Sequence, residues 1–562
     1  MNRLKYSFLI LVLGLFCSCS ISWSQDMSFI SSGVDVDDSK FIPDFSYAGY
    51  HNGIKKIPEK HGTVVQASTF SVLADDNLDD TSALQEAINK ASKLEGPVTL
   101  QLPAGKLIVS GILYIERDNF ILRGHGTDES GTEIYFPRPL MYSKDPEDLK
   151  ELREYLIEFD KRQKEKENNI DLPFSQYAWS GGFIWTRVPG ERVKPYLKKY
   201  DRPHEVLANV FEGKRGGKTL KISKVQNLAV GDVVELQLFN KNGQEGRILK
   251  DLYKEQNLKI GGHHWNFPDL PLVRQQVKIL SITDNNAIIN CPLTIDVKPE
   301  YKAQLVRWRH LKEVGIQDFS IRFPKSPRIA HHVEQGFNGI YLTRVYNSWV
   351  KNISIENADS GVLTENIANV TIEDVITKGE NIAHYTVAMS GTYNVLAKGI
   401  KVYNKAVHPL SFNTLATKCV YLNCEVFKDP ILDQHSGANH QNLFDNTTVY
   451  ITPDEEMSYP LFKGGGAGYW KPSHGAFSTF WNTKINVLND ISSSKKIKLF
   501  GMKDGPFSRI IGINGDRNFK VEYQPMAMIK DVNKVFEKFP SLYDYQLTKR
   551  KKIKSAVVDL DN

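Results

Sequence analysis

The fold is decided by five short segments: Asn352-Ile353-Ser354-Ile355, Asp374-Val375-Ile376-Thr377, Gly399-Ile400-Lys401-Val402, Asn423-Cys424-Glu425-Val426 and Asn446-Thr447-Thr448-Val449. Counted at their second residues, the segments follow one another at intervals of 22, 25, 24 and 23 residues. Each begins with a residue type that tolerates a left-handed or bent backbone. The second and fourth residues are mostly apolar, which is the period of a strand with one buried face. A repeat this short holds neither a helix pair nor a propeller blade, so it predicts one coil of a parallel β-helix.

The expected fold class is an all-β solenoid, a single-stranded right-handed parallel β-helix. Such a fold stacks equivalent side chains of neighbouring coils roughly 4.8 Å apart, so residues distant in sequence can share one site. The 562 residues are 41% hydrophobic and 24% charged, and the formal net charge is +6. No run of Lys and Arg is long enough to indicate a nucleic-acid partner, and the mild basic excess is compatible either with plain solubility or with a polyanionic ligand.

The first 24 residues have the pattern of a signal peptide. Arg3 and Lys5 precede an apolar run, 6–16, that is too short to span a bilayer. Ser22 and Ser24 stand where a signal peptidase needs small residues, and this cleavage would release a periplasmic or secreted chain. Alternatively, Cys19 could be the lipidated residue of an outer-membrane lipoprotein. No other segment indicates a transmembrane helix.

Cysteine usage argues against a disulfide framework. Past the signal segment only Cys291, Cys419 and Cys424 remain, an odd and small number for an exported chain. They are expected to be buried small hydrophobic residues. No Cys/His spacing matches a zinc site, so the sequence predicts no metal and no cofactor, although a structural or carboxylate-neutralising Ca²⁺ is left open.

Outside the repeats the chain divides into four further parts. Residues 25–141 are expected to form an N-terminal wrap, a short amphipathic helix after Asp79, and the first coils. Residues 142–285 lose the coil rhythm and predict an inserted charged helix at 145–168 and a small antiparallel β module. The main β-helix spans 286–515 with a loop insertion at 453–473. Residues 516–562 are expected to cover the C-terminal end of the stack, because an open coil end is an unpaired sheet edge.

The opening of the solenoid resembles a known superfamily. The motifs are Asp80-Thr81-x-Ala83-Leu84-Gln85-x-Ala87-Ile88, Leu102-Pro103-Ala104-Gly105 and Arg123-Gly124-His125-Gly126. Together they resemble the entrance of the pectate-lyase-like β-helix superfamily. The resemblance implies that the helix around Leu84 caps the N-terminal end of the solenoid, and it leaves the chemistry open because lyases, hydrolases and phage tailspikes share this fold.

Three histidines are the candidate catalytic residues. His384 lies 16 residues before Ile400, and His408 lies 16 residues before Cys424. The equal offset predicts that these two histidines stand one above the other on successive coils. The polar run 433–442 belongs to the next coil and adds His435. We assign His408 and His435 as base and acid, with His384 positioning His408; the alternative is a row of ladder residues that only bond the backbone.

The candidate substrate-binding residues surround this row. They are expected to place cations and aromatic faces against an acidic sugar: Arg344, Lys471, Arg328, Tyr469, Trp470, His440 and His474. The glycine-rich stretch 463–468 before Tyr469 lacks the Gly-Lys-Ser/Thr of a phosphate loop. It fits better as a loop that presents Tyr469 and Trp470 to sugar rings.

These residue types favour elimination over hydrolysis. Glycoside hydrolysis needs two carboxyl groups flanking the bond, and no such pair is clustered with the histidines in the sequence. β-Elimination on a uronic acid needs a group that neutralises the C6 carboxylate, a base for the C5 proton and an acid for the oxygen leaving C4. His, Tyr, Lys and Arg serve these roles, and the ordinary pKa of His lies close to physiological pH.

A second resemblance concerns the last third of the chain. The stretch from His435 through Asp445-Asn446 to His474-Gly475 and Phe480-Trp481-Asn482 is similar to β-helix proteins of polysaccharide-degrading marine Bacteroidota. It implies an acidic or sulfated algal polysaccharide, such as ulvan or alginate. The expected activity is C4–C5 elimination, as polysaccharide lyase or oligosaccharide dehydratase, by a monomer. The alternatives are a glycoside hydrolase and a non-catalytic glycan-binding β-helix.

Overall fold

The computed structural model describes residues 27, 29–163, 174–191, 194, 205–225, 227–241, 246–254, 270–466, 471–489 and 495–560. The predicted signal peptide at 1–24, including Cys19, lies outside the described residues. In the part of the chain that is described, none of the helices combines the length and apolar character needed to cross a bilayer.

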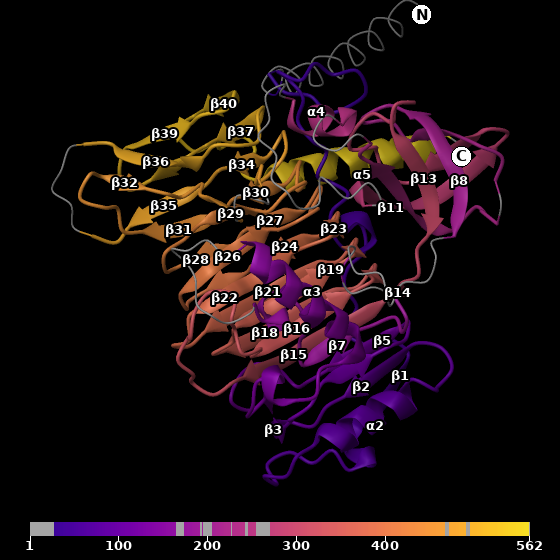
Figure 1. Ribbon diagram of the computed structural model, residues 1–562, viewed down its shortest axis with the longest axis vertical. Helices are drawn as coiled ribbons and strands as arrows, with labels where there is room; N and C mark the ends of the chain where they lie inside the picture. The colour runs from indigo at the N-terminus through magenta and orange to yellow at the C-terminus, as the bar shows by residue number, and fades with distance from the viewer. Residues whose placement is uncertain are drawn as a thin grey trace, which may run out of the picture.

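The chain winds into the predicted right-handed parallel β-helix, with its coils stacked along the long axis of the molecule (Figure 1). Each regular coil contributes strands to three parallel sheets. In one such coil, β16 (Asn338–Thr343) belongs to an eight-stranded sheet, β17 (Val345–Tyr346) to a four-stranded sheet and β18 (Trp349–Glu356) to a nineteen-stranded sheet, called the long sheet below. The expected fold class is therefore confirmed.

The strands of the three parallel sheets have the following bounds. The long sheet also contains β1 (Thr63–Gln66), β2 (Val98–Gln101), β3 (Gly105–Ile108), β5 (Phe120–Arg123), β6 (Thr132–Tyr135), β15 (Val314–Arg322), β21 (Thr371–Lys378), β24 (Leu396–Lys398), β25 (Lys401–Val402), β27 (Val420–Leu422), β28 (Glu425–Val426), β30 (Leu443–Asp445), β31 (Thr448–Ile451), β34 (Thr479–Trp481), β35 (Lys484–Val487), β37 (Ser508–Ile511), β38 (Asn514–Gly515) and β40 (Ala527–Lys530). The eight-stranded sheet also contains β4 (Leu113–Ile115), β7 (Ile184–Thr186), β19 (Ser360–Glu365), β22 (Ala383–Met389), β26 (Ala406–Phe412), β29 (Leu432–His435) and β33 (Gly464–Gly465). The four-stranded sheet is completed by β14 (Leu311–Lys312), β20 (Ile367–Ala368) and β23 (Thr392–Tyr393).

The repeat read from the sequence is the register of the long sheet. Ile353 pairs with Val375, and two positions further on Ile355, Thr377, Val402, Val426 and Val449 pair in one unbroken row. The residues that open the five segments, from Asn352 to Asn446, all have positive φ, between 50° and 66°. A left-handed residue at the same place in each coil bends every strand alike. The spacing of those residues therefore fixes the stacking of the coils.

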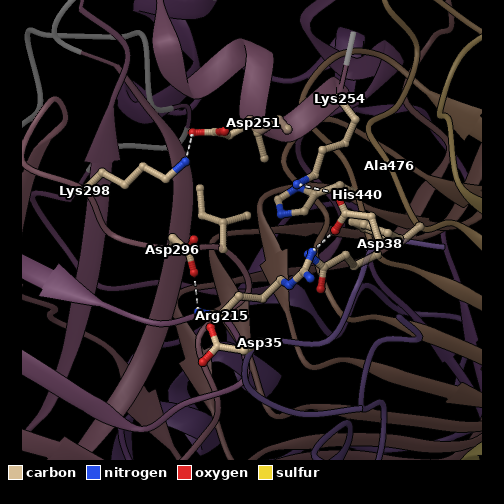
Figure 2. Close-up of a pocket in the computed structure, with 13 residues that line it drawn as sticks. Asp35, Asp38, Arg215, Asp251, Lys254, Asp296, Lys298, His440 and Ala476 are labelled. Carbon is tan, nitrogen blue, oxygen red and sulfur yellow. Dashed lines mark hydrogen bonds and ion pairs between the residues drawn. The ribbon is translucent and has the colours of Figure 1, made fainter. Parts of the chain in front are cut away.

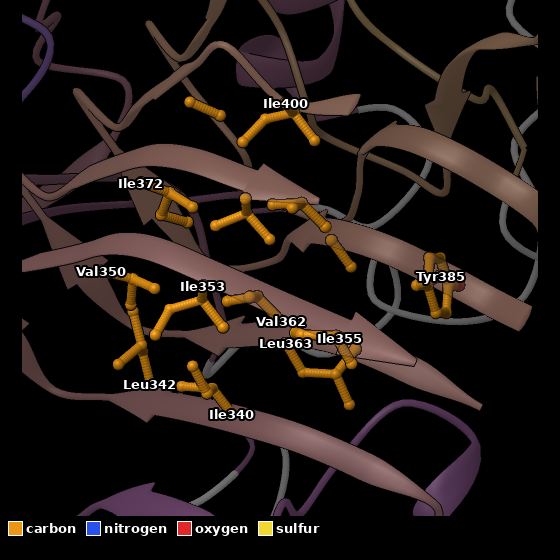
Figure 3. Close-up of a cluster of buried hydrophobic side chains, with 14 of the residues drawn as sticks. Ile340, Leu342, Val350, Ile353, Ile355, Val362, Leu363, Ile372, Tyr385 and Ile400 are labelled. Atoms are coloured by element: carbon orange, nitrogen blue, oxygen red, sulfur yellow. The ribbon is translucent and has the colours of Figure 1, made fainter. Parts of the chain in front are cut away.

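The core lies inside the coils and continues through them. Figure 3 shows Ile340, Ile353, Val362, Ile372 and Ile400 from successive strands, and each of these side chains is 0 or 1% exposed. The three cysteines Cys291, Cys419 and Cys424 are free and buried, as expected. Each coil buries its apolar side chains against the coils above and below it, which is the stabilisation expected of a solenoid.

The inserted module is a closed antiparallel barrel. It has six strands: β8 (Val206–Gly213), β9 (Thr219–Ile222), β10 (Val233–Phe239), β11 (Pro271–Thr283), β12 (Asn286–Ile289) and β13 (Lys302–Arg307). The antiparallel module therefore runs to Arg307, and the expected boundary at 285 is too early. Helix α4 (Arg247–Tyr253) packs into the barrel core, which also includes Leu415 and Ala438 of the solenoid.

Three helices lie against the solenoid. Helix α2 (Thr81–Ala91) lies at the end of the stack near β1 and β2 (Figure 1), and its role as a cap stays a prediction. The helix expected at 145–168 is α3 (Glu147–Gln163). Its leucines Leu149, Leu152 and Leu156 are buried in the main core.

The C-terminal segment lies along a flank of the stack, not over its end. Helix α5 (Leu542–Leu560) and the N-terminal segment around Phe45 enclose a cluster with Leu396, Val420 and Leu443, which pair or follow one another on successive coils. The expected cover at 516–562 is wrong in this respect, because the apolar outer row of the long sheet offers more surface to bury than the coil end does.

The predicted loop insertion at 453–473 is partly regular structure. Gly464-Gly465 forms β33 and pairs with Gln434-His435 of β29. Ser458-Tyr459 forms β32, which joins β36 (Ile497–Met502) and β39 (Phe519–Tyr523) in a three-stranded sheet. The chain therefore passes His435 as a further strand of the eight-stranded sheet and not as an open loop.

Candidate functional site

The three predicted catalytic histidines lie together on neighbouring strands of the eight-stranded sheet. His384 is on β22, His408 on β26 and His435 at the end of β29. The ring centroids of His384 and His408 are 5.4 Å apart, and those of His408 and His435 are 4.2 Å apart. The structure thus brings together the three residues that the sequence singled out.

The predicted register of two of these histidines is wrong by one residue. His408 pairs with Tyr385, not with His384. The reason is the turn after β26: Met389 and Tyr393 are four residues apart, whereas their partners Phe412 and Thr417 are five apart. An equal offset to the long sheet therefore does not give equal positions on the eight-stranded sheet.

A turn before β16 adds two more imidazoles to the cluster. His331 lies with its ring centroid 4.6 Å from that of His384, and His332 lies 5.5 Å from His384. The rings of His331 and His332 are 3.7 Å apart. Residues 331, 332, 384, 408 and 435 are called the histidine cluster below. The sequence placed the first two in the wall of a groove, since nothing in their spacing showed that they join the other three.

Two carboxyl groups lie inside the histidine cluster. An oxygen of Asp433 is 3.2 Å from Nδ1 of His408 and 3.4 Å from Nδ1 of His435. The same oxygen accepts a hydrogen bond of 2.6 Å from the hydroxyl of Ser411. An oxygen of Glu334 is 3.2 Å from Nδ1 of His384. Sequence reasoning missed both acids as partners of the histidines, although Asp433 lies only two residues before His435.

Burial makes the imidazoles poor at holding a proton. It lowers the pKa of His384 and His332 well below the ordinary value, and it lowers the pKa of His331 to about 2. The pKa of His408 is also lowered by burial, although Asp433 opposes the shift. Burial opposes ionisation of Asp433, but His408 and His435 beside it hold its pKa below the ordinary value. The cluster is therefore a set of neutral imidazoles around an ionised carboxylate.

Several of these polar atoms are left without hydrogen bonds. Among the described residues, both ring nitrogens of His384 and of His408, Nδ1 of His435 and Oδ1 of Asp433 are buried and have no hydrogen-bond partner. Buried polar atoms in folded proteins are nearly always paired, because an unpaired one costs about 1–3 kcal/mol. So many in one place indicate a ligand-binding site.

Tyr385 and Arg328 complete the site. The ring of Tyr385 stacks on His384 at 4.1 Å and on His408 at 5.1 Å, and its hydroxyl accepts a hydrogen bond of 3.1 Å from the Asn413 amide. Burial raises the pKa of Tyr385 well above its ordinary value. Arg328 donates a hydrogen bond of 3.0 Å to Nδ1 of His331. Arg328, predicted to bind substrate, therefore does lie at the cluster.

Arg344 lies elsewhere. It follows the C-terminal end of β16, whereas His331 and His332 precede the N-terminal end of that strand. Its guanidinium is 3.4 Å from a Glu191 oxygen and donates to the carbonyl of Arg309. The structure therefore does not bring Arg344 to the histidines, since the length of β16 separates them.

His440 lines a separate pocket of about 210 Å³ between the barrel, α4 and the N-terminal segment (Figure 2). Its Nδ1 is 3.0 Å from the carbonyl oxygen of Ala438, and burial lowers its pKa to about 4. The charged residues of this pocket pair with one another: Asp38 lies 2.6 Å from Arg215 and 3.0 Å from Lys254. This pocket is consequently a polar junction of modules, and His440 is not part of the cluster.

Lys471 lies near the cluster, and the remaining predicted residues do not join it in the structure. The Lys471 ammonium is 3.4 Å from the carbonyl oxygen of Gly465, the residue that pairs with His435. His474 is buried, with Nδ1 2.9 Å from the Ser473 hydroxyl and Nε2 3.4 Å from that of Tyr523. Tyr469 and Trp470 lie outside the described residues.

Comparisons with known proteins return only distant structural similarity. Neither a family model nor a curated protein sequence matches the chain. The tailspike protein gp49 from Pseudomonas phage LKA1 is 11% identical with a TM-score of 0.39, over 83% of this chain and 80% of that one. The DFA-IIIase from Arthrobacter chlorophenolicus A6 without its lid is 10% identical with a TM-score of 0.37, over 85% and 97%. The mannuronan C-5 epimerase AlgE6 A-module from Azotobacter vinelandii is 11% identical with a TM-score of 0.34, over 83% and 95%.

Proposed function

We propose that the protein is an enzyme that acts on a uronate-containing polysaccharide, or on its oligosaccharides, by β-elimination between C4 and C5. The observation that carries this proposal is the histidine cluster with Tyr385 and Arg328 at its side. Buried imidazoles of lowered pKa are proton acceptors at neutral pH, and general bases of this kind contribute about 10²–10⁴-fold to rate.

The parts that elimination needs are close to one another. His384 and His408 are candidates for taking the C5 proton, and His435 for protonating the oxygen that leaves C4. Tyr385, stacked between His384 and His408, offers a phenol that stays protonated. Arg328 supplies a cation for the C6 carboxylate at the His331 end of the cluster.

Hydrolysis is the weaker alternative. Retaining and inverting glycosidases place two carboxyl groups roughly 5–5.5 or 6.5–9.5 Å apart, one on each side of the scissile bond. Here both carboxyl groups, Asp433 and Glu334, lie 3.2 Å from a histidine ring nitrogen. Acids engaged by imidazoles are suited to orienting a base and not to flanking a glycosidic oxygen.

The finer parts of the proposal concern the substrate and the leaving group. A sulfated algal uronan of the ulvan type is proposed from the resemblance of the last third of the chain, together with export through the segment 1–24. Expulsion of a sugar from C4 makes the enzyme a lyase, and expulsion of hydroxide from a non-reducing-end uronate makes it an oligosaccharide dehydratase. Both need the same C5 proton transfer.

One assay tests these alternatives. The mature protein is incubated with plant and algal uronans and their oligosaccharides, and ultraviolet absorbance of the new double bond is recorded beside reducing ends and mass spectra. A lyase raises both signals, and a dehydratase raises absorbance with loss of water from an intact oligosaccharide. New reducing ends without absorbance would replace the proposal by hydrolysis, and no product from any substrate would replace it by glycan binding.

A further inference from the structure

We propose that His408, Asp433 and His435 bind a divalent transition-metal ion of the zinc type. The sequence predicted no metal and left only Ca²⁺ open, and that expectation is untested. The ligand atoms of these three residues lie within 4.8 Å of one another, and all three residues are buried. Two imidazoles and one carboxylate form a set that zinc uses in catalytic sites, whereas Ca²⁺ takes oxygen ligands.

The distances between the donor atoms fit a tetrahedral ion. Zinc–nitrogen and zinc–oxygen bonds of about 2.0–2.1 Å place two ligand atoms of a tetrahedron roughly 3.3–3.4 Å apart, and those of an octahedron roughly 2.9 Å apart. The Asp433 oxygen is 3.2 Å from Nδ1 of His408 and 3.4 Å from Nδ1 of His435. The observed edges therefore match a small tetrahedral ion.

The same atoms are not paired with each other. Despite these short distances, Nδ1 of His408 and Nδ1 of His435 have no hydrogen-bond partner in the described part of the chain, and neither has Oδ1 of Asp433. Ser411 fixes the other carboxylate oxygen with a hydrogen bond of 2.6 Å. Two ring nitrogens near an anchored carboxylate, yet not aimed at it for hydrogen bonding, are what ligands of a common ion show.

A second trio of potential ligands, His331, His384 and His408, is less suitable. Arg328 donates a hydrogen bond of 3.0 Å to Nδ1 of His331, so a guanidinium charge stands beside that trio. A cation would be repelled there, whereas Asp433 supplies a negative charge to the first trio. The geometry therefore assigns the ion to the Asp433 side of the cluster.

An ion at this position would divide the work of the proposed reaction. It would neutralise the C6 carboxylate of the substrate from an open fourth position, as catalytic zinc sites keep one. His408 and His435 would then be ligands, and His384 would be the proton acceptor, oriented by the Glu334 oxygen 3.2 Å away. This division rests on the proposed function, but the binding of the ion does not.

The test begins with metal content. Elemental analysis of the purified mature protein should find about one zinc-type ion per chain, a chelator should remove it and lower Tm, and Zn²⁺ should restore both. Co²⁺ added to the stripped protein should give the visible absorption bands of tetrahedral coordination. His408→Ala, His435→Ala and the isosteric Asp433→Asn should each bind Zn²⁺ about 10-fold or more weakly.

Two further variants serve as controls. His384→Ala, inside the cluster, and His440→Ala, outside it, should keep the ion and the Co²⁺ bands. The proposal is overturned if the stripped protein gains no Co²⁺ bands and no stability with Zn²⁺. It is equally overturned if His331→Ala and His384→Ala lose the ion while Asp433→Asn keeps it. Metal binding without elimination would refute the proposed function alone, and elimination by a metal-free protein would refute the ion alone.

Discussion

The long sheet and the eight-stranded sheet are built from the same coils, yet they treat polar side chains in opposite ways. In the long sheet, the polar residues at the bend of each coil bond one another: Asn446 donates to Asn423 at 2.7 Å, and Asn352 donates to Asp318 at 2.9 Å. In the eight-stranded sheet, the polar residues of β22, β26 and β29 are buried and largely unpaired within the described structure. One wall satisfies its polar atoms and the other leaves them open.

This difference separates structural residues from candidate functional ones. A sequence specifies a fold when local conformation, pattern and polar satisfaction agree, and departures concentrate at functional sites. The row from Ile353 to Val449 shows such agreement. The histidine cluster departs from it, since nothing in the fold requires five imidazoles and two acids to be buried together. The predictions below act on one wall at a time.

The largest effect is expected at the unpaired wall. His384→Ala should lower turnover by about 10²–10⁴-fold, because a buried neutral imidazole is the proton acceptor in the proposed reaction. The measurement is kcat and KM on the best uronan substrate, with Tm as a check on folding. His440→Ala, a buried histidine in the separate pocket of Figure 2, should leave kcat within about twofold. Equal losses in both variants would show that buried histidines serve only the fold.

The second effect is on stability and concerns the paired wall. Ile400→Ala should cost about 2–5 kcal/mol of unfolding free energy, because Ile400 is 0% exposed and the cavity would lie between the Val375 and Cys424 coils. Denaturant unfolding measures the change, with activity per folded molecule as a second readout. Leu488→Ala, at a side chain that is 58% exposed, is the control and should change little. A large loss of turnover in folded Ile400→Ala would mean that the two walls are coupled.

The third effect isolates the bend that sets the repeat. Asn423 has φ of 52°, so Asn423→Ala should cost about 1–2 kcal/mol through backbone strain. Asn423→Gly loses the same bond from Asn446 but tolerates the conformation, so it should be the more stable variant. Thermal unfolding of the two variants compares them. If Ala and Gly are equally stable, the left-handed bend does not fix the register.

The sequence predicted the paired wall well because its information is local. Each bend carries its own signal in a residue such as Gly399 or Asn423, and the period between bends sets the register. The unpaired wall needs the turn lengths as well: one extra residue after β26 pairs His408 with Tyr385. Neither Tyr385 nor Asp433 carries a signal of its own, so the sequence singled out the histidines but not their partners.

Two other features also depend on contacts between distant segments. The barrel closes because β13 pairs with both β8 and β10, and no local pattern in 286–307 announces this pairing. The metal proposal has the same origin, since a search of sequence spacing finds ligands on one element, whereas His408 and Asp433 lie on neighbouring coils. Register between coils, not motif spacing, decides which side chains meet.

The smallest effect is expected at the edge of the unpaired wall. The Lys471 ammonium lies 3.4 Å from the carbonyl of Gly465 and 4.0 Å from an Asp504 oxygen, and its side chain is 36% exposed. If it attracts the anionic substrate, Lys471→Ala should raise KM by up to about tenfold with kcat unchanged, because a partly solvated charge contributes roughly 1 kcal/mol. Lys471→Arg keeps the charge and should stay near the parent KM, and added salt should narrow the gap between Ala and Arg. A fall in kcat with KM unchanged would instead place Lys471 in the chemical step, and the proton transfers would then not be confined to the histidine cluster.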